Sequence, residues 1–570
     1  MLMLSGSPAL AAVIDACTPA EHWDLPRSDL SREWMKDFMR FTSGKEPPMT
    51  GLARSIRLGR IADLMKDGEQ ERGFSEYGIS RALYDLGLPA LAHRGFRSVF
   101  EHAVHPDLKR ASWICLARIH GVLPDLPVPA WSPEHRVSGP EPAFTRSEAD
   151  AIVPVLIGRK SGIETLLPPS HQAFLRGLEA LQEKRFEQST AFLRDFLKHL
   201  ALHPGTPLDS WRDEAWLSLG RALYPAGRFK EAANAFQQVR KTSNLEIEAL
   251  GNLAWAYLAE KDYEGALGIG IQLRSGGLRR AFAPEPLMVS AMALHELCRY
   301  PDSVRMIAAL VKDYEDSRAW LETHPHITDR YALTLAALKG SRDLPSKIAS
   351  EWIRSPKFQR RQLELNELAR IPPRITAITE AENARYRKMI RSALQDANEL
   401  AQNLRALKKG SSPAPLLARY RELKRTRRNI DAFRTALHEF AALSQAHLAS
   451  LAPLQSRIID RVNTDLRALS RALLANLDSV RRNADLIEVE ILNGASRDLV
   501  WNSVHPDFKE ESLPEKSPAT ARNPAASWSW GRLRHSELER AELWEDELGA
   551  LKADAGSLCE KFTHTEEKTR

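Results

Sequence analysis

The sequence has few cysteines and none of the short motifs that mark common catalytic or metal sites. Its 570 residues include four cysteines that lie far apart, so there is no CxxC pair for zinc, redox chemistry or haem attachment. A P-loop, a GxGxxG turn and a GxSxG elbow are also missing. The stretch that starts at His295 begins like HExxH, but Arg299 replaces the second histidine. We therefore predict no catalytic residue, no metal site and no cofactor, and we expect that the chain is not an enzyme.

Long apolar runs are missing too, because no stretch approaches the roughly 18 residues that a membrane-spanning helix needs. Residues 1–17 are apolar and contain no Lys or Arg, and Ala9-Leu10-Ala11 has the small-x-small form of a signal-peptidase site. We interpret 1–17 as a truncated signal peptide whose basic start lies upstream of the assigned start codon. This interpretation predicts a periplasmic or cell-envelope protein of a bacterium, and the alternative is the frayed N-terminus of a cytoplasmic protein.

Two of the four cysteines give expectations about burial and about the compartment. Cys115 and Cys298 lie in apolar helical stretches and are expected to be buried, and a disulfide is expected only in an oxidising compartment.

The net charge is only +6, yet residues 351–434 hold 20 Lys/Arg against 9 Asp/Glu. Its densest part is a basic patch formed by Lys424, Arg425, Arg427 and Arg428. Three interpretations stay open: a solvated helix face, an anionic lipid or protein partner, and nucleic acid, for which aromatic residues are sparse.

The composition predicts an all-α fold, since Ala, Leu, Arg and Glu dominate and alternating β-branched residues are scarce. A two-helix unit begins at Asp213, with small residues at positions 8 and 20 and large residues at positions 4, 7 and 24. The pattern returns after 34 residues at Ile247, again at Pro284, and upstream near Ser170. In the first of these units the pattern residues are Trp216, Leu219, Gly220, Ala232 and Phe236.

This pattern resembles the tetratricopeptide repeat (TPR) over roughly residues 170–320. The resemblance implies a solenoid of antiparallel helical hairpins whose skeleton residues are core. It also implies a groove, lined by the first helix of each hairpin, that binds a partner's peptide or helix. Positions 2, 5, 9 and 12 place these residues in the groove: Phe174, Glu214, Leu217, Arg221, Tyr224, Glu248, Trp255, Met288, Met292 and His295.

From about residue 345 the periodicity indicates three long helices. The first opens at a capping box that starts at Thr379, and the third follows Pro453. The third helix has an apolar seam from Ile459 to Ile491 with spacings of three and four. We predict a long antiparallel coiled-coil bundle that follows the TPR-like solenoid and self-associates.

The predicted organisation follows from these patterns and from six prolines between residues 121 and 145. Its parts are a truncated signal peptide (1–17), N-terminal helical hairpins (18–120), a Pro-rich linker (121–145), the TPR-like solenoid (146–345), the coiled-coil bundle (346–503), a linker (504–526) and an acidic amphipathic helix (527–570).

Residues 488–501 and the later WEDELG are similar to the C-terminal region of repeat-plus-coiled-coil envelope proteins from gliding and predatory bacteria. The two resemblances together imply a non-enzymatic protein–protein interaction scaffold in a periplasmic assembly. The alternative is a cytoplasmic adaptor or regulator whose basic bundle binds nucleic acid or an anionic membrane surface. In either case peripheral membrane contact is compatible with the sequence, nucleic acid is the weaker expectation, and no transmembrane helix is expected.

Overall fold

The computed structural model describes residues 47–65, 68–131, 144–158, 164–406 and 414–504. All regular elements in these ranges are helices, which confirms the predicted all-α class. The chain divides into two compact units: unit 1 is Met1–Gln172 with Arg360–Ile459, and unit 2 is Ala173–Gln359 with Asp460–Arg570. The predicted signal peptide, the acidic C-terminal helix and all but the first residue of the linker before it lie outside the described residues.

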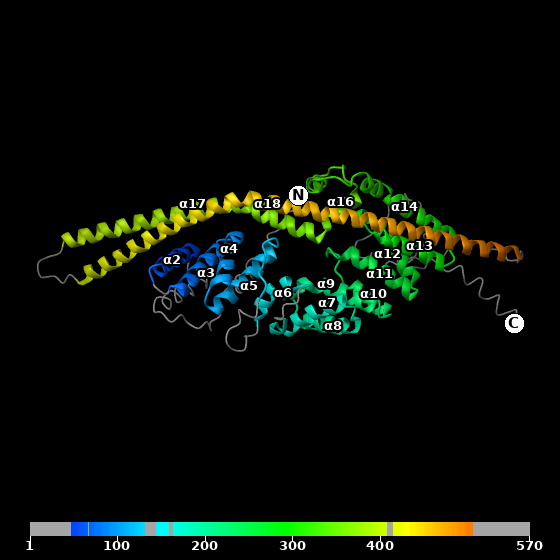
Figure 1. Cartoon of the computed structure of the whole chain (residues 1–570), viewed down its shortest axis with the longest axis horizontal. Helices are drawn as coiled ribbons and strands as arrows, with labels where there is room; N and C mark the ends of the chain where they lie inside the picture. Colours follow the sequence, from blue (N-terminus) through cyan, green and yellow to red (C-terminus); the bar gives the residue numbers. More distant parts are fainter. Residues whose placement is uncertain (1–46, 66–67, 132–143, 159–163, 407–413, 505–570) are drawn as a thin grey trace, which may run out of the picture. The chain divides into compact units, whose positions relative to one another are not determined.

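Unit 1 contains the N-terminal hairpins, in which each helix from α2 to α5 packs against the next (Figure 1). Phe74, Tyr77 and Trp113 are fully buried between these helices and supply much of the apolar core. Three of the helices begin with a proline, which fits a first helical turn because the N–H there has no partner within the helix. The helices are α2 (Pro48–Ala62), α3 (Glu69–Asp85), α4 (Pro89–His102), α5 (Pro106–Val122) and α6 (Arg146–Leu156).

Within the predicted Pro-rich linker (121–145), residues 123–131 are irregular and pack within unit 1. Trp113 Nε1 donates a hydrogen bond of 3.0 Å to the carbonyl oxygen of Pro129. The Nε2 atom of His93 lies 3.0 Å from the carbonyl oxygen of Pro127. Leu123 is 1% exposed. This stretch therefore belongs to the core of unit 1, and the boundary between units falls later, after Gln172.

Unit 2 contains consecutive helices that pack in sequence order from α8 to α14, as hairpins do (Figure 1). The element before them, α7 (Pro169–Gln182), crosses the boundary between the units. The others are α8 (Phe186–Leu202), η5 (Pro207–Trp211), α9 (Arg212–Leu223), α10 (Phe229–Gln237), α11 (Glu246–Glu260), α12 (Tyr263–Arg274), η6 (Gly276–Arg280), α13 (Glu285–Glu296), α14 (Tyr300–Thr323), α15 (Arg330–Leu338) and α16 (Ser346–Arg354), with η4 (Glu164–Leu166) preceding α7.

The small positions of the repeat pattern lie where two helices of a hairpin meet. Gly220 and Phe236 are buried, and a Cβ atom on Gly220 would lie 2.3 Å from Cε1 of Phe236. Leu219 and Ala232 are buried as predicted, whereas Trp216 is half-buried. The missing side chain at position 8 therefore allows the close approach of α9 and α10.

In two other hairpins a serine at position 20 joins the helices. Ser189 Oγ donates a 2.8 Å hydrogen bond to the carbonyl oxygen of Gly177. Ser303 Oγ donates a 2.6 Å bond to the carbonyl oxygen of Ala291. Both acceptors stand at position 8, so the same two positions meet in hairpins with different residues.

We expect Ser189→Ala to lower the free energy of unfolding by about 1 kcal/mol, because it removes the buried hydrogen bond that joins α7 to α8. Thr190→Val is the matched control: its buried hydroxyl has no hydrogen-bond partner in the described part of the chain, so its removal should be neutral or stabilising. Urea unfolding of both variants measures the difference. Equal effects at the two neighbours would contradict the assigned register.

Two long helices complete the described chain, α17 (Pro356–Arg405) and α18 (Ala414–Val504), where three had been predicted. Thr379 does not cap a helix, because it lies inside α17 and its Oγ1 donates to the carbonyl oxygen of Ile375. Pro453 does not break a helix either, since α18 continues through it. Proline removes one backbone hydrogen bond, and the buried neighbours Leu451 and Ile458 hold the helix across that gap.

Within unit 1, α17 and α18 form an antiparallel pair. Tyr386 stacks on Phe433 with ring centroids 6.3 Å apart, and further along Arg419 lies 3.8 Å from Glu399. Leu400 of this pair is 5% exposed, but four other apolar side chains between residues 394 and 420 are at least half exposed. These side chains are Leu394, Leu404, Leu417 and Tyr420. The predicted bundle is thus a helical hairpin here, with an open apolar surface at its outer end.

The two cysteines within the described residues differ in their surroundings. Cys115 is buried and free, as predicted for an apolar core position. Cys298 follows α13 with a left-handed φ of 54° and is only half-buried, so the prediction of a buried residue is wrong there. It takes part in a disulfide.

Candidate functional site: the face of the repeats in unit 2

Three of the ten predicted groove residues lie in the core, so the prediction is wrong for Phe174, Leu217 and Met288. Their exposed fractions are 0%, 0% and 3%. The insertion before α9 explains the first of them, because Trp211 stacks on Phe174 with ring centroids 5.3 Å apart. All three residues stand at position 5 of their units, and this position is buried in these hairpins.

The other seven predicted groove residues are half-buried or exposed. Arg221 and Glu248 form an ion pair that joins α9 to α11. Burial raises the pKa of Glu214, the charge of Arg221 opposes that rise, and Glu248 adds to it. His295 lies 3.6 Å from Glu296. The seven residues are Glu214, Arg221, Tyr224, Glu248, Trp255, Met292 and His295.

The second half of α18 covers part of this face. Asn476 Nδ2 donates a 2.9 Å hydrogen bond to Glu285 Oε1 on α13. Arg221 and Glu248 share a cavity of about 520 Å³ with Leu473 and Asn476 of α18. Helix α18 of the same chain therefore covers the middle of the predicted groove.

The apolar seam of α18 packs on the repeats, where a coiled-coil partner had been predicted. Asp478 pairs with Arg318 of α14 at 3.2 Å, and Asn463 Oδ1 accepts a 2.8 Å hydrogen bond from the backbone N–H of Tyr331. These contacts follow the helix for several turns beside α13 and α14 (Figure 1). The buried seam residues in unit 2 are Val462, Leu466, Leu473, Leu477, Val480, Ala484, Ile487 and Ile491.

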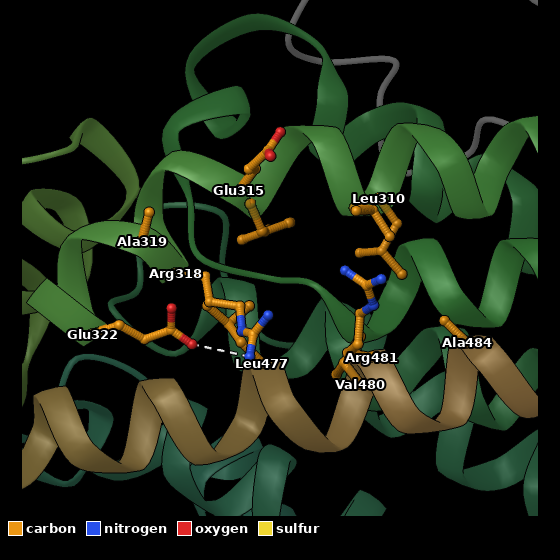
Figure 2. A pocket seen from close by; sticks show the side chains of 11 residues that line it. Leu310, Glu315, Arg318, Ala319, Glu322, Leu477, Val480, Arg481 and Ala484 are labelled. Atoms are coloured by element: carbon orange, nitrogen blue, oxygen red, sulfur yellow. Dashed lines mark ion pairs between the residues drawn. The ribbon is translucent and has the colours of Figure 1, made fainter.

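A small cavity of about 230 Å³ remains between α14 and α18 (Figure 2). Leu310 lines it from α14, while Val480 and Ala484 line it from α18. Arg318 forms an ion pair of 2.9 Å with Glu322 at one end. The cavity is apolar with charged groups around it, as expected of an imperfectly filled seam between two helices.

The basic patch lies on the part of α18 that belongs to unit 1. Lys424, Arg425, Arg427 and Arg428 are all exposed. Within the described residues none of the four takes part in an ion pair. Their charges are therefore open to solvent.

The described part of the chain has neither a cluster of metal-binding side chains nor a helix that could span a membrane. There, no group of three or more His, Cys, Asp or Glu side chains could hold a metal ion. No helix in the same ranges has the length and apolarity needed to cross a membrane.

Comparison with known proteins adds no relative: no family model, no curated protein and no solved structure matches this chain.

Proposed function

We propose that the chain is a non-enzymatic protein–protein interaction scaffold of tetratricopeptide-repeat type, within a bacterial cell-envelope assembly. The observation that carries this proposal is the docking of α18, whose apolar row packs on the repeat helices. A face that holds an amphipathic helix from its own chain has the shape and apolarity to hold one from a partner.

The proposal that this face binds a partner rests on the groove residues that remain partly exposed. Tyr224, Trp255 and Met292 are half-buried, and aromatic and Met side chains are enriched at the centres of protein interfaces. These three side chains come from three successive first helices, α9, α11 and α13, or from the residue directly after one. An extended or helical segment could contact them in turn.

The disulfide at Cys298 supports the compartment in this proposal. Disulfides persist in the periplasm and outside cells, and they are rare in the reducing cytosol. Export would place the protein where this bond is stable. Fractionation of the native organism, with sequencing of the mature N-terminal peptide, tests this part of the proposal directly.

We expect Trp255→Ala to weaken partner binding about 10- to 100-fold, because truncated aromatic anchors cost roughly 2 kcal/mol or more. The partner is first captured in cells by a photo-crosslinking phenylalanine analogue at position 255. The matched control carries the analogue at Leu202, which is 69% exposed at the end of α8 and outside the predicted groove. Binding of the identified partner is then measured with the Trp255→Ala variant.

A specific product at position 255 that is missing at position 202 supports the groove. The same products at both positions, or an unchanged affinity of the Trp255→Ala variant, would refute it. Thermal unfolding of Trp255→Ala serves as the check on folding, since a large loss of stability would place Trp255 in the core.

A second candidate function is the cytoplasmic adaptor or regulator whose basic helices bind nucleic acid or an anionic membrane surface. The exposure of Lys424, Arg425, Arg427 and Arg428 favours it. Binding of this kind weakens steeply with salt, because each neutralised phosphate releases counterions. A cytoplasmic location together with steep salt dependence would favour this candidate over the envelope scaffold.

A further inference from the structure

Unit 2 contains a large hollow that none of the predicted groove residues lines, although it shares Ala283 and Arg354 with the cavity beside α18. It lies between the end of α12 with η6, the middle of α14, and the loop that leads into α16. Its volume is about 1090 Å³, which is at the upper end of the size of small-molecule sites. Apolar side chains such as Leu273, Leu287 and Ile353 line part of it.

The charges around this hollow are almost all positive. One acidic side chain lines it, Asp313, which pairs with Arg274 at 3.4 Å. None of the other five cations forms an ion pair with any residue that the structure describes. We call the hollow the cationic pocket and define it by Arg274, Arg279, Arg280, Arg342, Lys347 and Arg354.

Lys347 is half-buried in this pocket. Its Nζ atom lies 4.0 Å from the centroid of the Tyr314 ring, and Tyr314 is itself buried. Burial lowers the pKa of Lys347, Arg274 and Arg279 lower it further, and Asp313 opposes the shift. An anion in the pocket would relieve this repulsion among cations.

Neutral donors on the same wall indicate which kind of anion fits. Ser346 and Ser350 line the pocket, and so does the N-terminal end of α16, whereas the hydroxyl of Ser341 already donates to Asp343 Oδ2. No side chain caps that end, because its N-cap residue is Pro345. Uncapped backbone N–H groups at a helix start bind phosphate well, and arginine matches phosphate oxygens with two parallel hydrogen bonds.

From these observations we propose that the cationic pocket binds a ligand that carries several phosphate groups. Its volume exceeds the needs of a single phosphate, and the charge of the five cations that form no ion pair with the described residues exceeds that of a single phosphate. The apolar wall would contact the body of the ligand, and the arginines would hold its phosphates. This site is independent of the proposed scaffold function, and either could fail without the other.

The test is isothermal titration calorimetry of the full chain with tripolyphosphate and with inositol hexakisphosphate, at physiological salt. We expect binding of at least one probe, and a Kd about 10- to 100-fold higher in the double variant Arg279→Gln with Arg342→Gln. Both side chains are exposed, so the variant should fold normally, and circular dichroism checks that it does. The matched control is Arg425→Gln with Arg428→Gln, which removes the same charge from the basic patch in unit 1.

An unchanged Kd in the control supports a specific pocket. An equal loss in both double variants would overturn the proposal, because binding would then follow net charge alone. No heat with either phosphate probe would also overturn it. Titration of a hexaglutamate peptide separates phosphate from carboxylate: tight binding of that peptide in place of the phosphates would show that the ligand class is wrong.

Discussion

Replacing Gly220 with Leu should destabilise unit 2 by about 3 kcal/mol, the upper range for overpacking a close contact. The glycine faces Phe236, whose ring atoms Cε1, Cδ1 and Cζ would lie 2.3, 2.6 and 2.7 Å from an added Cβ. The ring is 2% exposed and enclosed by the hairpin, so it has little room to move away. A leucine adds three further carbon atoms to the same contact.

The sharper comparison is between Gly220→Ala and Gly251→Ala. Both glycines lie inside first helices of adjacent hairpins, α9 and α11, but a Cβ at Gly251 would meet no atom within 4 Å. Alanine favours a helix over glycine by about 1 kcal/mol, so Gly251→Ala should stabilise the protein. Gly220→Ala should destabilise it by about 1–2 kcal/mol despite the same gain in propensity.

Urea unfolding measures both variants, with hydrogen exchange of α9 and α10 assigning the change to unit 2. Stability gains of equal size at the two positions would show that α9 and α10 do not meet at Gly220. The repeat register would then be wrong, and with it the placement of every predicted groove residue.

The sequence predicted the helical class and the interior of the hairpins because these depend on local spacing. Gly220, Ala232 and Phe236 are few residues apart, and a hairpin brings such positions together whatever surrounds it. Trp216 is only half-buried, because its surroundings depend on more than its own hairpin. Phe174 is buried for the same kind of reason, since Trp211 from an insertion covers it.

The partner of the α18 seam could not be predicted in this way. Spacings of three and four between Ile459 and Ile491 predict an apolar row on a helix, but they do not say what packs on it. The predicted helix boundaries at Thr379 and Pro453 were wrong for a related reason. Both are local signals for a helix end, but Thr379 Oγ1 donates to a carbonyl oxygen inside α17 and α18 continues through Pro453.

The cationic pocket could not be predicted from the sequence either. Its six cations are spread between residues 274 and 354, and only Arg279 and Arg280 are adjacent. A sum of charge over a sequence window finds the dense basic patch at Lys424 to Arg428 and passes over the pocket. The fold brings these side chains together from four segments of the chain. The pocket can therefore be recognised only once the fold is known.

The second large expected effect concerns α18, which covers part of the repeat helices of unit 2. We expect the double variant Leu466→Asp with Ile491→Asp to release α18 from the repeat helices of unit 2. Both side chains are 1% exposed, and each substitution puts an unpaired carboxylate in an apolar seam, at a cost of about 3 kcal/mol or more. The matched control is Leu486→Asp with Leu492→Asp on the same helix, where the leucines are 65% and 59% exposed and the change should be near neutral.

Limited proteolysis and hydrogen exchange of residues 460–496 report the release directly. Cleavage within this range in the seam variant alone is the expected result, and equal behaviour of the two variants would mean that α18 does not dock through its apolar row. The released repeats also provide a test of the scaffold proposal. If their face takes amphipathic helices, a synthetic peptide of residues 460–496 should bind the seam variant and fail to bind the parent protein, whose own α18 occupies the site. Release without any binding of that peptide would separate the two questions: α18 would be a structural strut, and the partner-binding face would have to lie elsewhere.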